Sequence, residues 1–143
     1  MVKILLSSHG HFASGLKTSL DILLGNSDVV TAIDAYVDDS NLADKLDEFF
    51  AQTAENDQVI MMSDLLGGSV NTEMYKRLTR PNTYLIAGVN LALVLEIAAM
   101  AGFNEDGFEK DFLLNTVENS KNAIELLELE EAEEQPEEEE DFF

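Results

Sequence analysis

Four short apolar segments, each followed by a stretch with helical periodicity, most constrain the fold of this 143-residue chain. The apolar segments are residues 2–6, 28–35, 58–63 and 83–87. Strands that alternate with helices form a parallel sheet, because a crossover connection is needed to start the next strand in the same direction. We therefore predict an α/β fold. It is an open, mostly parallel, doubly wound sheet in the order 2-1-3-4, flanked by helices.

The helical stretches carry apolar residues three or four positions apart. We expect them to begin near Ser14, after Ser40, after Ser69, at Leu91 and at about Glu105, with the last ending at Asn122. Residues 91–100 are apolar nearly all round, so that helix must be covered on most sides, and we favour a second subunit as part of the cover. On pattern alone, residues 123–129 fit either a helical extension or a short strand.

The acidic residues are unevenly distributed along the chain, whose net charge is −21. Ten of them lie between Glu128 and Phe143, so the other 127 residues carry −11. Nucleic-acid binding depends on basic side chains that contact phosphates. The chain has only eight Lys and Arg residues, which disfavours this function. A Glu-rich segment cannot bury enough apolar surface to fold. We therefore predict a single domain at 1–129 and an acidic disordered tail at 130–143.

Several classes of protein are disfavoured by what the sequence lacks. It contains no cysteine, which excludes disulfides, thiolate metal sites and a cysteine nucleophile. No apolar run approaches the roughly 20 residues of a membrane span. The first residues also lack the basic and then apolar pattern of a signal peptide. We expect a cytoplasmic protein without direct membrane insertion and without a cofactor.

The residues with the most chemical potential follow the first and third predicted strands. Both histidines, His9 and His11, lie in the loop after the first strand. Asp64 follows the third strand, and Gly67-Gly68-Ser69 leads into the next helix. In the order 2-1-3-4 the winding reverses between these two strands, and ligands bind at such a reversal. We therefore expect His9 and Asp64 to converge on one crevice.

Three roles are open to a histidine in this position. As a general base it needs a nucleophile, and the candidates are Ser7, Ser8, Ser14 and Ser69, but the sequence has no Gly-x-Ser-x-Gly turn. As a metal ligand it would join His11 and Asp64. Loop residues two positions apart point in different directions, however, and no further strong ligand is evident, so we expect no metal site. The third role is that the imidazole is itself the nucleophile.

The third role agrees best with the neighbouring residues. A neutral imidazole attacks phosphorus without a separate base. A carboxylate such as Asp64 that accepts a hydrogen bond from one ring nitrogen leaves the other lone pair free. Gly67, Gly68 and Ser69 at a helix start supply N–H groups, a hydroxyl and room for close approach of a phosphate. Together they predict a phosphoryl-transfer site in which His9 is the nucleophile.

Three segments carry a resemblance to a known family. They are Ser8-His9-Gly10, Ser63-Asp64-Leu65-Leu66-Gly67-Gly68-Ser69-Val70-Asn71 and Ile86-Ala87-Gly88-Val89-Asn90-Leu91. Their order and spacing resemble the mannose-family (mannose/fructose/sorbose class) enzyme IIA component of the bacterial phosphoenolpyruvate-dependent sugar phosphotransferase system. The similarity covers residues 1 to about 125.

The resemblance implies specific roles for the site residues. His9 would accept a phosphoryl group from the histidine-containing phosphocarrier protein and pass it to enzyme IIB, for coupled uptake and phosphorylation of a sugar. Asp64 would orient the imidazole, and Gly67, Gly68 and Ser69 would hold the phosphate. The resemblance also implies a homodimer that exchanges a final antiparallel strand, for which residues 123–127 are the candidate. We expect enzyme IIB to be a separate protein.

Two other functions remain open from the sequence. One is the related phosphotransferase subunit that serves a dihydroxyacetone kinase. The other is a non-enzymatic regulator that is switched by phosphorylation of His9. His11, Lys76 and Arg77 are candidates for a docking surface. The transported sugar is not encoded in these residues, because an enzyme IIA of this kind meets only protein partners.

Overall fold

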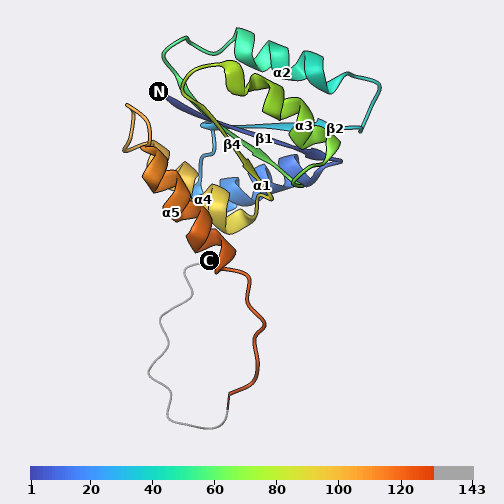
Figure 1. The fold of residues 1–143 in the computed structure, drawn as a ribbon. Coiled ribbons are helices and arrows are strands. Elements are labelled where there is room, and N and C mark those ends of the chain that lie inside the picture. Colours follow the sequence, from blue (N-terminus) through green and yellow to red (C-terminus); the bar gives the residue numbers. More distant parts are fainter. Residues whose placement is uncertain (131–143) are drawn as a thin grey trace.

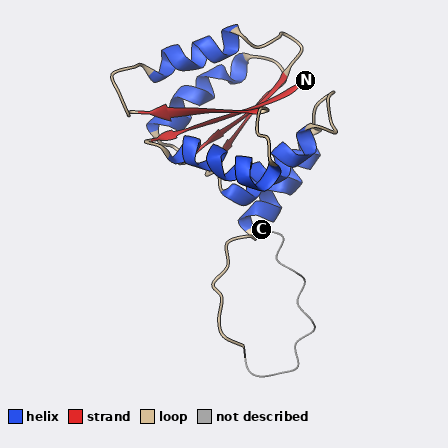
Figure 2. Ribbon diagram, turned by 180° about the vertical axis from the view of Figure 1, so that it is seen from behind, coloured by secondary structure: helices blue, strands red, loops and turns tan. Residues whose placement is uncertain are grey.

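A four-stranded parallel sheet between two layers of helices forms the centre of the computed structural model, which describes residues 1–130 (Figures 1 and 2). The strands are β1 (Val2–His9), β2 (Val30–Ala35), β3 (Gln58–Ser63) and β4 (Thr83–Ala87). Their order is β2-β1-β3-β4, and every neighbouring pair is parallel. The predicted fold class and the order 2-1-3-4 are confirmed.

Helices cover both faces of this sheet (Figure 1). On one face lie α1 (Phe12–Leu24) and α4 (Leu91–Ala101), with α5 (Lys110–Lys121) packed against α4. On the other lie α2 (Leu42–Ala51) and α3 (Ser69–Tyr75), which continues into the 3-10 helix η1 (Lys76–Thr79). The carboxyl ends of β1 and β3, the two central strands, therefore open between the layers.

The two central strands are held by apolar side chains that alternate between the faces of the sheet, as a strand with a period of two requires. In β1, Ile4 and Leu6 pack in the cluster beneath α1 and α4, whereas Leu5 packs beneath α2 and α3. In β3, Ile60 and Met61 divide in the same way. All six residues of β3 are buried, which confirms that this strand is enclosed on both faces.

The first strand runs on to His9 instead of ending at residue 6, and the first helix begins at Phe12 instead of near Ser14. Two further boundaries differ from the predicted ones because local hydrogen bonds form turns there. The second strand begins at Val30 instead of residue 28, since the Val30 N–H donates to Ser27 O at 2.8 Å. The last helix begins at Lys110 instead of Glu105, because residues 104–107 form a turn that the Gly107 N–H closes on Asn104 O at 2.9 Å. None of these shifts changes the topology.

Residues 123–129 form neither a helix nor a strand within this single chain, so the helical extension considered for them is not formed. Four apolar side chains of this segment are strongly exposed: Ile124, Leu126, Leu127 and Leu129. Exchange of residues 123–127 into a second subunit stays a prediction. The predicted acidic tail lies outside the described residues except for Glu130. Within residues 1–130, no helix is long and apolar enough to cross a bilayer.

The buried side chain of Gln58 joins the start of β3 to the loop that precedes α5. Its Oε1 accepts a hydrogen bond from the Phe108 N–H at 2.7 Å, and its Nε2 donates to Phe108 O at 3.0 Å. The same Nε2 donates to Asn82 Oδ1 at 3.2 Å. Gln58 therefore satisfies both backbone groups of the buried residue Phe108, and it fixes this loop to the sheet.

We predict that Gln58→Leu lowers the free energy of unfolding by about 2–4 kcal/mol, because each buried backbone group of Phe108 left without a partner costs roughly 1–3 kcal/mol. Denaturant unfolding monitored by circular dichroism measures the loss. Gln52→Leu is the matched control, because Gln52 is exposed at the end of α2. Equal stabilities of the two variants would contradict this role for Gln58.

Candidate functional site

The structure brings His9 and Asp64 together at the carboxyl ends of β1 and β3. His9 is the last residue of β1, and Asp64 directly follows β3. One carboxylate oxygen of Asp64, Oδ2, lies 2.8 Å from His9 Nδ1 and also accepts the His9 backbone N–H at 2.8 Å. Ser7, two residues before His9, and Ser63, directly before Asp64, are partners in the parallel register, so strand pairing sets this approach.

The turn between β1 and α1 is held by the side chain of Ser8. Its Oγ accepts the Ala13 N–H at 2.7 Å and donates to Gly10 O at 3.2 Å. The Gly10 N–H in turn donates to Ala35 O at the end of β2, at 2.9 Å. The backbone on both sides of His9 is thereby fixed, and the histidine side chain remains 44% exposed.

The protonation of Asp64 determines which nitrogen of His9 is free. Burial acts to raise the pKa of Asp64, but the hydrogen bonds from the His9 backbone and ring outweigh it, and the pKa is lowered. The carboxylate is therefore ionised at neutral pH and accepts hydrogen bonds only. Nδ1 of His9 must then carry the proton, which leaves the lone pair on Nε2.

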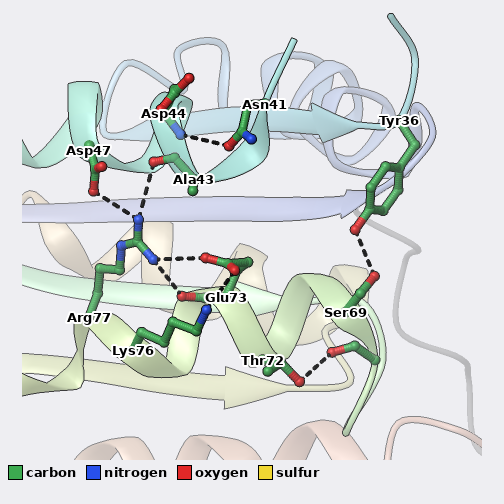
Figure 3. A network of polar contacts seen from close by, with 11 residues as sticks. Tyr36, Asn41, Ala43, Asp44, Asp47, Ser69, Thr72, Glu73, Lys76 and Arg77 are labelled. Atoms are coloured by element: carbon green, nitrogen blue, oxygen red, sulfur yellow. Dashed lines mark hydrogen bonds and ion pairs between the residues drawn. The ribbon is translucent and has the colours of Figure 1, made fainter. Parts of the chain in front are cut away.

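Gly68 and Ser69 lie against the other side of the imidazole, and Gly67 precedes them in the same loop. Gly67 has a φ of 79°, a conformation that favours glycine. A Cβ at Gly68 would lie 3.4 Å from His9 Cε1, an ordinary van der Waals distance, so Gly68 lies directly beside the imidazole. Ser69 Oγ is 3.3 Å from His9 Nε2. It is also 2.7 Å from the hydroxyl of Tyr36, the contact that Figure 3 shows.

His11 is paired with a different carboxylate. Its Nδ1 lies 2.9 Å from Asp34 Oδ2, and Asp34 also accepts the N–H and the hydroxyl of Ser14 at 3.0 and 2.6 Å. Burial acts to raise the pKa of Asp34, but these hydrogen bonds lower it overall. His11 therefore points away from Asp64. No three His, Asp or Glu side chains within residues 1–130 are grouped so that they would hold a metal ion.

Lys76 and Arg77 are not brought to His9, because they lie at the opposite end of the helical segment from Ser69 (Figure 3). The Arg77 guanidinium donates to Glu73 Oε2 at 3.0 Å and to Asp47 Oδ1 at 2.8 Å. Lys76 Nζ also pairs with Glu73, at 2.8 Å. Arg77 thus ties this segment to α2, and a docking role for the two cations stays a prediction.

The sequence reasoning missed two kinds of residue at this edge of the sheet. Asp34 and Tyr36 follow the same rule as His9, since they lie at the end of a strand that neighbours β1. That position is the signal from which they might be nominated. The second kind is a set of exposed apolar side chains on the loops at the carboxyl ends of the strands and at the start of α1: Phe12, Tyr36, Val37, Leu65 and Leu66.

A comparison with known protein families identifies the family to which the chain belongs. The family model described as the PTS system fructose IIA component (EIIA-man) matches residues 3–112. The chain belongs to the mannose-family IIA components of the sugar phosphotransferase system. Proteins of this IIA family are phosphotransferases and form part of a sugar transport system. The match includes His9 and the loop at 64–69. No curated protein sequence matches the chain.

Solved structures of IIA proteins share the fold. A protein from Klebsiella pneumoniae described as a phosphoenolpyruvate-dependent sugar phosphotransferase system permease is 31% identical, with a TM-score of 0.79 over 87% of this chain and 90% of that one. The mannose/sorbose-specific IIA subunit from Enterococcus faecalis is 25% identical, with a TM-score of 0.74 over 92% and 98%. A IIA protein associated with the fucose utilization operon of Streptococcus pneumoniae is 26% identical, with a TM-score of 0.70 over 87% and 92%.

We predict that Asp64→Asn destabilises this IIA protein most above pH about 5. Because the pKa of Asp64 is lowered in the folded chain, its ionised form stabilises the fold above the unfolded value of about 3.9, and this contribution is lost as the pH falls through the folded pKa. Urea unfolding between pH 3 and 7 measures the difference from wild type, which shrinks toward acid. Asp39→Asn controls for the loss of one exposed charge. A difference that does not change with pH would contradict the prediction.

Proposed function

We propose that this chain is a phosphoryl carrier, in which His9 accepts a phosphoryl group from the histidine-containing phosphocarrier protein and passes it to enzyme IIB. One observation carries the proposal. The hydrogen bond from His9 Nδ1 to the Asp64 carboxylate leaves the Nε2 lone pair on a partly exposed ring, beside the Ser69 hydroxyl. A lone pair held in this way is the nucleophile that phosphoryl transfer requires.

The reaction is an exchange of one N–P bond for another. The Nε2 lone pair of His9 attacks phosphorus, and the bond from phosphorus to the donor imidazole breaks, with its electron pair returning to the donor nitrogen. The His9 ring becomes positively charged, because Nδ1 keeps its proton while Nε2 acquires the phosphoryl group. The Asp64 carboxylate, 2.8 Å from Nδ1, stabilises that charge as it develops.

The second transfer reverses these changes. When the acceptor on enzyme IIB attacks phosphorus, the N–P electrons return to Nε2 and the His9 ring is neutral again. Throughout both steps the phosphoryl oxygens need hydrogen-bond donors. The Ser69 hydroxyl is one, and the first N–H groups of α3 are others, because Gly68 has no side chain to cap them. We assign phosphate binding to Gly67, Gly68 and Ser69 on this basis.

Both partners must reach the same atom, so we propose that they dock in turn on the same face. The exposed apolar side chains of Phe12, Val37, Leu65 and Leu66 lie on segments that adjoin His9 or the neighbouring strand ends. Apolar side chains of this kind form the core of a transient protein interface and keep water from the reacting group. His11, 78% exposed, adds a polar contact at the edge of this face.

The remaining parts of the proposal concern assembly and location. We propose a domain that spans residues 1–129 and works in the cytoplasm as a homodimer that exchanges residues 123–127. The exposed apolar side chains of that segment, Leu126 among them, would be covered by the second subunit. The protein would associate with the membrane permease through enzyme IIB.

We predict that phosphoenolpyruvate, enzyme I and the phosphocarrier protein together label His9 with an acid-labile phosphate. His9→Ala should abolish the label, because the nucleophile is removed, and His11→Ala should retain it. Intact-protein mass spectrometry and radiolabelling measure both. A label that persists in His9→Ala and is lost in His11→Ala would refute the assignment.

The acceptor distinguishes this proposal from the two alternatives. Transfer of the label from His9 to an enzyme IIB supports the transport carrier. Transfer only to a dihydroxyacetone kinase subunit would indicate the soluble kinase system. A stable label that neither acceptor removes would indicate a regulator that is switched by phosphorylation.

We predict that Leu66→Ser lowers kcat/KM for phosphorylation by about tenfold, mainly by raising KM for the phosphocarrier protein, since removal of an interface anchor typically costs ~1–2 kcal/mol. Initial rates at varied carrier concentration measure the change. Leu114→Ser is the matched control, because Leu114 is an exposed leucine on α5, remote in sequence from the site. An equal effect of both substitutions would exclude a specific contact at Leu66.

A further inference from the structure

Tyr36 has a backbone conformation that tyrosine rarely adopts. Its φ is 66°, and among the described residues Asn82 is the only other residue besides glycine with a positive φ. A bulky side chain in this left-handed region costs on the order of 1–3 kcal/mol, and such residues persist only where their surroundings hold them. Tyr36 directly follows β2, the edge strand that pairs with β1.

Burial does not explain the position of this side chain, because Tyr36 is 61% exposed. Its two specific contacts are both with the site. The ring lies 5.4 Å from the His9 ring, centroid to centroid, at an angle of 46°. The hydroxyl lies 2.7 Å from Ser69 Oγ, and Figure 3 shows the side chain extending from the loop after β2 to the start of α3.

The direction of the hydrogen bonds follows from the tautomer of His9. Nδ1 carries the ring proton, so Nε2 is an acceptor only. Ser69 Oγ, 3.3 Å from Nε2, must therefore direct its own proton at that nitrogen. A hydroxyl has one proton, so the contact between Ser69 and Tyr36 is made by the Tyr36 O–H, which donates to Ser69 Oγ.

The hydrogen bond from Ser69 Oγ to His9 Nε2 occupies the lone pair that would attack phosphorus. The Nε2 lone pair becomes available only when the Ser69 proton turns away from it, toward an oxygen of the arriving phosphoryl group. Serine Oγ has three staggered positions, and rotation about Cα–Cβ would carry the oxygen off the site. A donor that remains on Oγ allows the proton to turn while the oxygen stays in place.

We propose that Tyr36 is a positioning residue for phosphoryl transfer at His9, and that it acts by holding the Ser69 oxygen through its hydroxyl. This inference rests on the proposed function of His9. The tyrosine neither gains nor loses a proton in the step. The strained φ is retained because it directs the hydroxyl across the gap between the end of β2 and the start of α3.

Tyr36→Phe tests the inference, because it removes the hydroxyl and keeps the ring beside His9. We expect the maximal rate of phosphorylation by the phosphocarrier protein to fall about tenfold, with KM nearly unchanged. We also expect the ¹⁵N resonance of His9 Nε2 to move in the direction seen in Ser69→Ala, because both variants weaken the hydrogen bond to that lone pair. Tyr75→Phe is the matched control, since Tyr75 is a tyrosine of similar exposure, at the far end of α3 from Ser69.

The double variant Tyr36→Phe/Ser69→Ala shows whether the two residues act as one unit. We expect it to be no slower than Ser69→Ala alone, since Tyr36 has nothing to hold once the serine oxygen is gone. Effects that multiply in the double variant would overturn the inference, as would a wild-type rate and an unshifted Nε2 resonance in Tyr36→Phe. If the wild-type protein itself takes up no label at His9, the proposed function fails instead.

Discussion

A single carboxylate oxygen, Oδ2 of Asp64, controls the geometry of the site because it binds His9 twice. It accepts both the backbone N–H at the end of β1 and the ring nitrogen Nδ1, each at 2.8 Å. The strand end and the imidazole are therefore fixed by the same atom and cannot shift independently. Asp64 thereby also sets the direction of Nε2, the nitrogen on the side of the ring where Gly68 and Ser69 lie.

This double contact depends on the packing of the two central strands. Ser7 pairs with Ser63 in register, so Asp64, the residue after β3, lies beside the last residues of β1. Apolar layers on both faces, with Leu5 on one side and Leu6 on the other, hold that register. A slip by one residue would reverse the faces of a whole strand, which makes such a slip very costly. The packed core thus fixes the positions of the residues at the ends of β1 and β3.

The fold and the central pair of the site follow from sequence because both depend on periodicity and topology. Alternating strands and helices give the sheet order, and the reversal of winding places His9 near Asp64. The contact between Tyr36 and Ser69 was not predictable, because it depends on a left-handed φ within a loop, which no periodic pattern encodes. The ion pair of Arg77 with Asp47 was missed for a related reason, since it depends on how α2 packs beside α3 and η1.

His9, the last residue of β1, and His11, in the turn that follows, can be compared directly. His9 and His11 each direct Nδ1 at an aspartate, at 2.8 and 2.9 Å, so their carboxylate partners are nearly equivalent. The difference lies at the second nitrogen, which in His9 faces Ser69, whereas within residues 1–130 that of His11 makes no hydrogen bond. The two histidines therefore differ in what their second nitrogen faces and not in the kind of group that binds the first. Two side chains of identical chemistry differ there only in their surroundings.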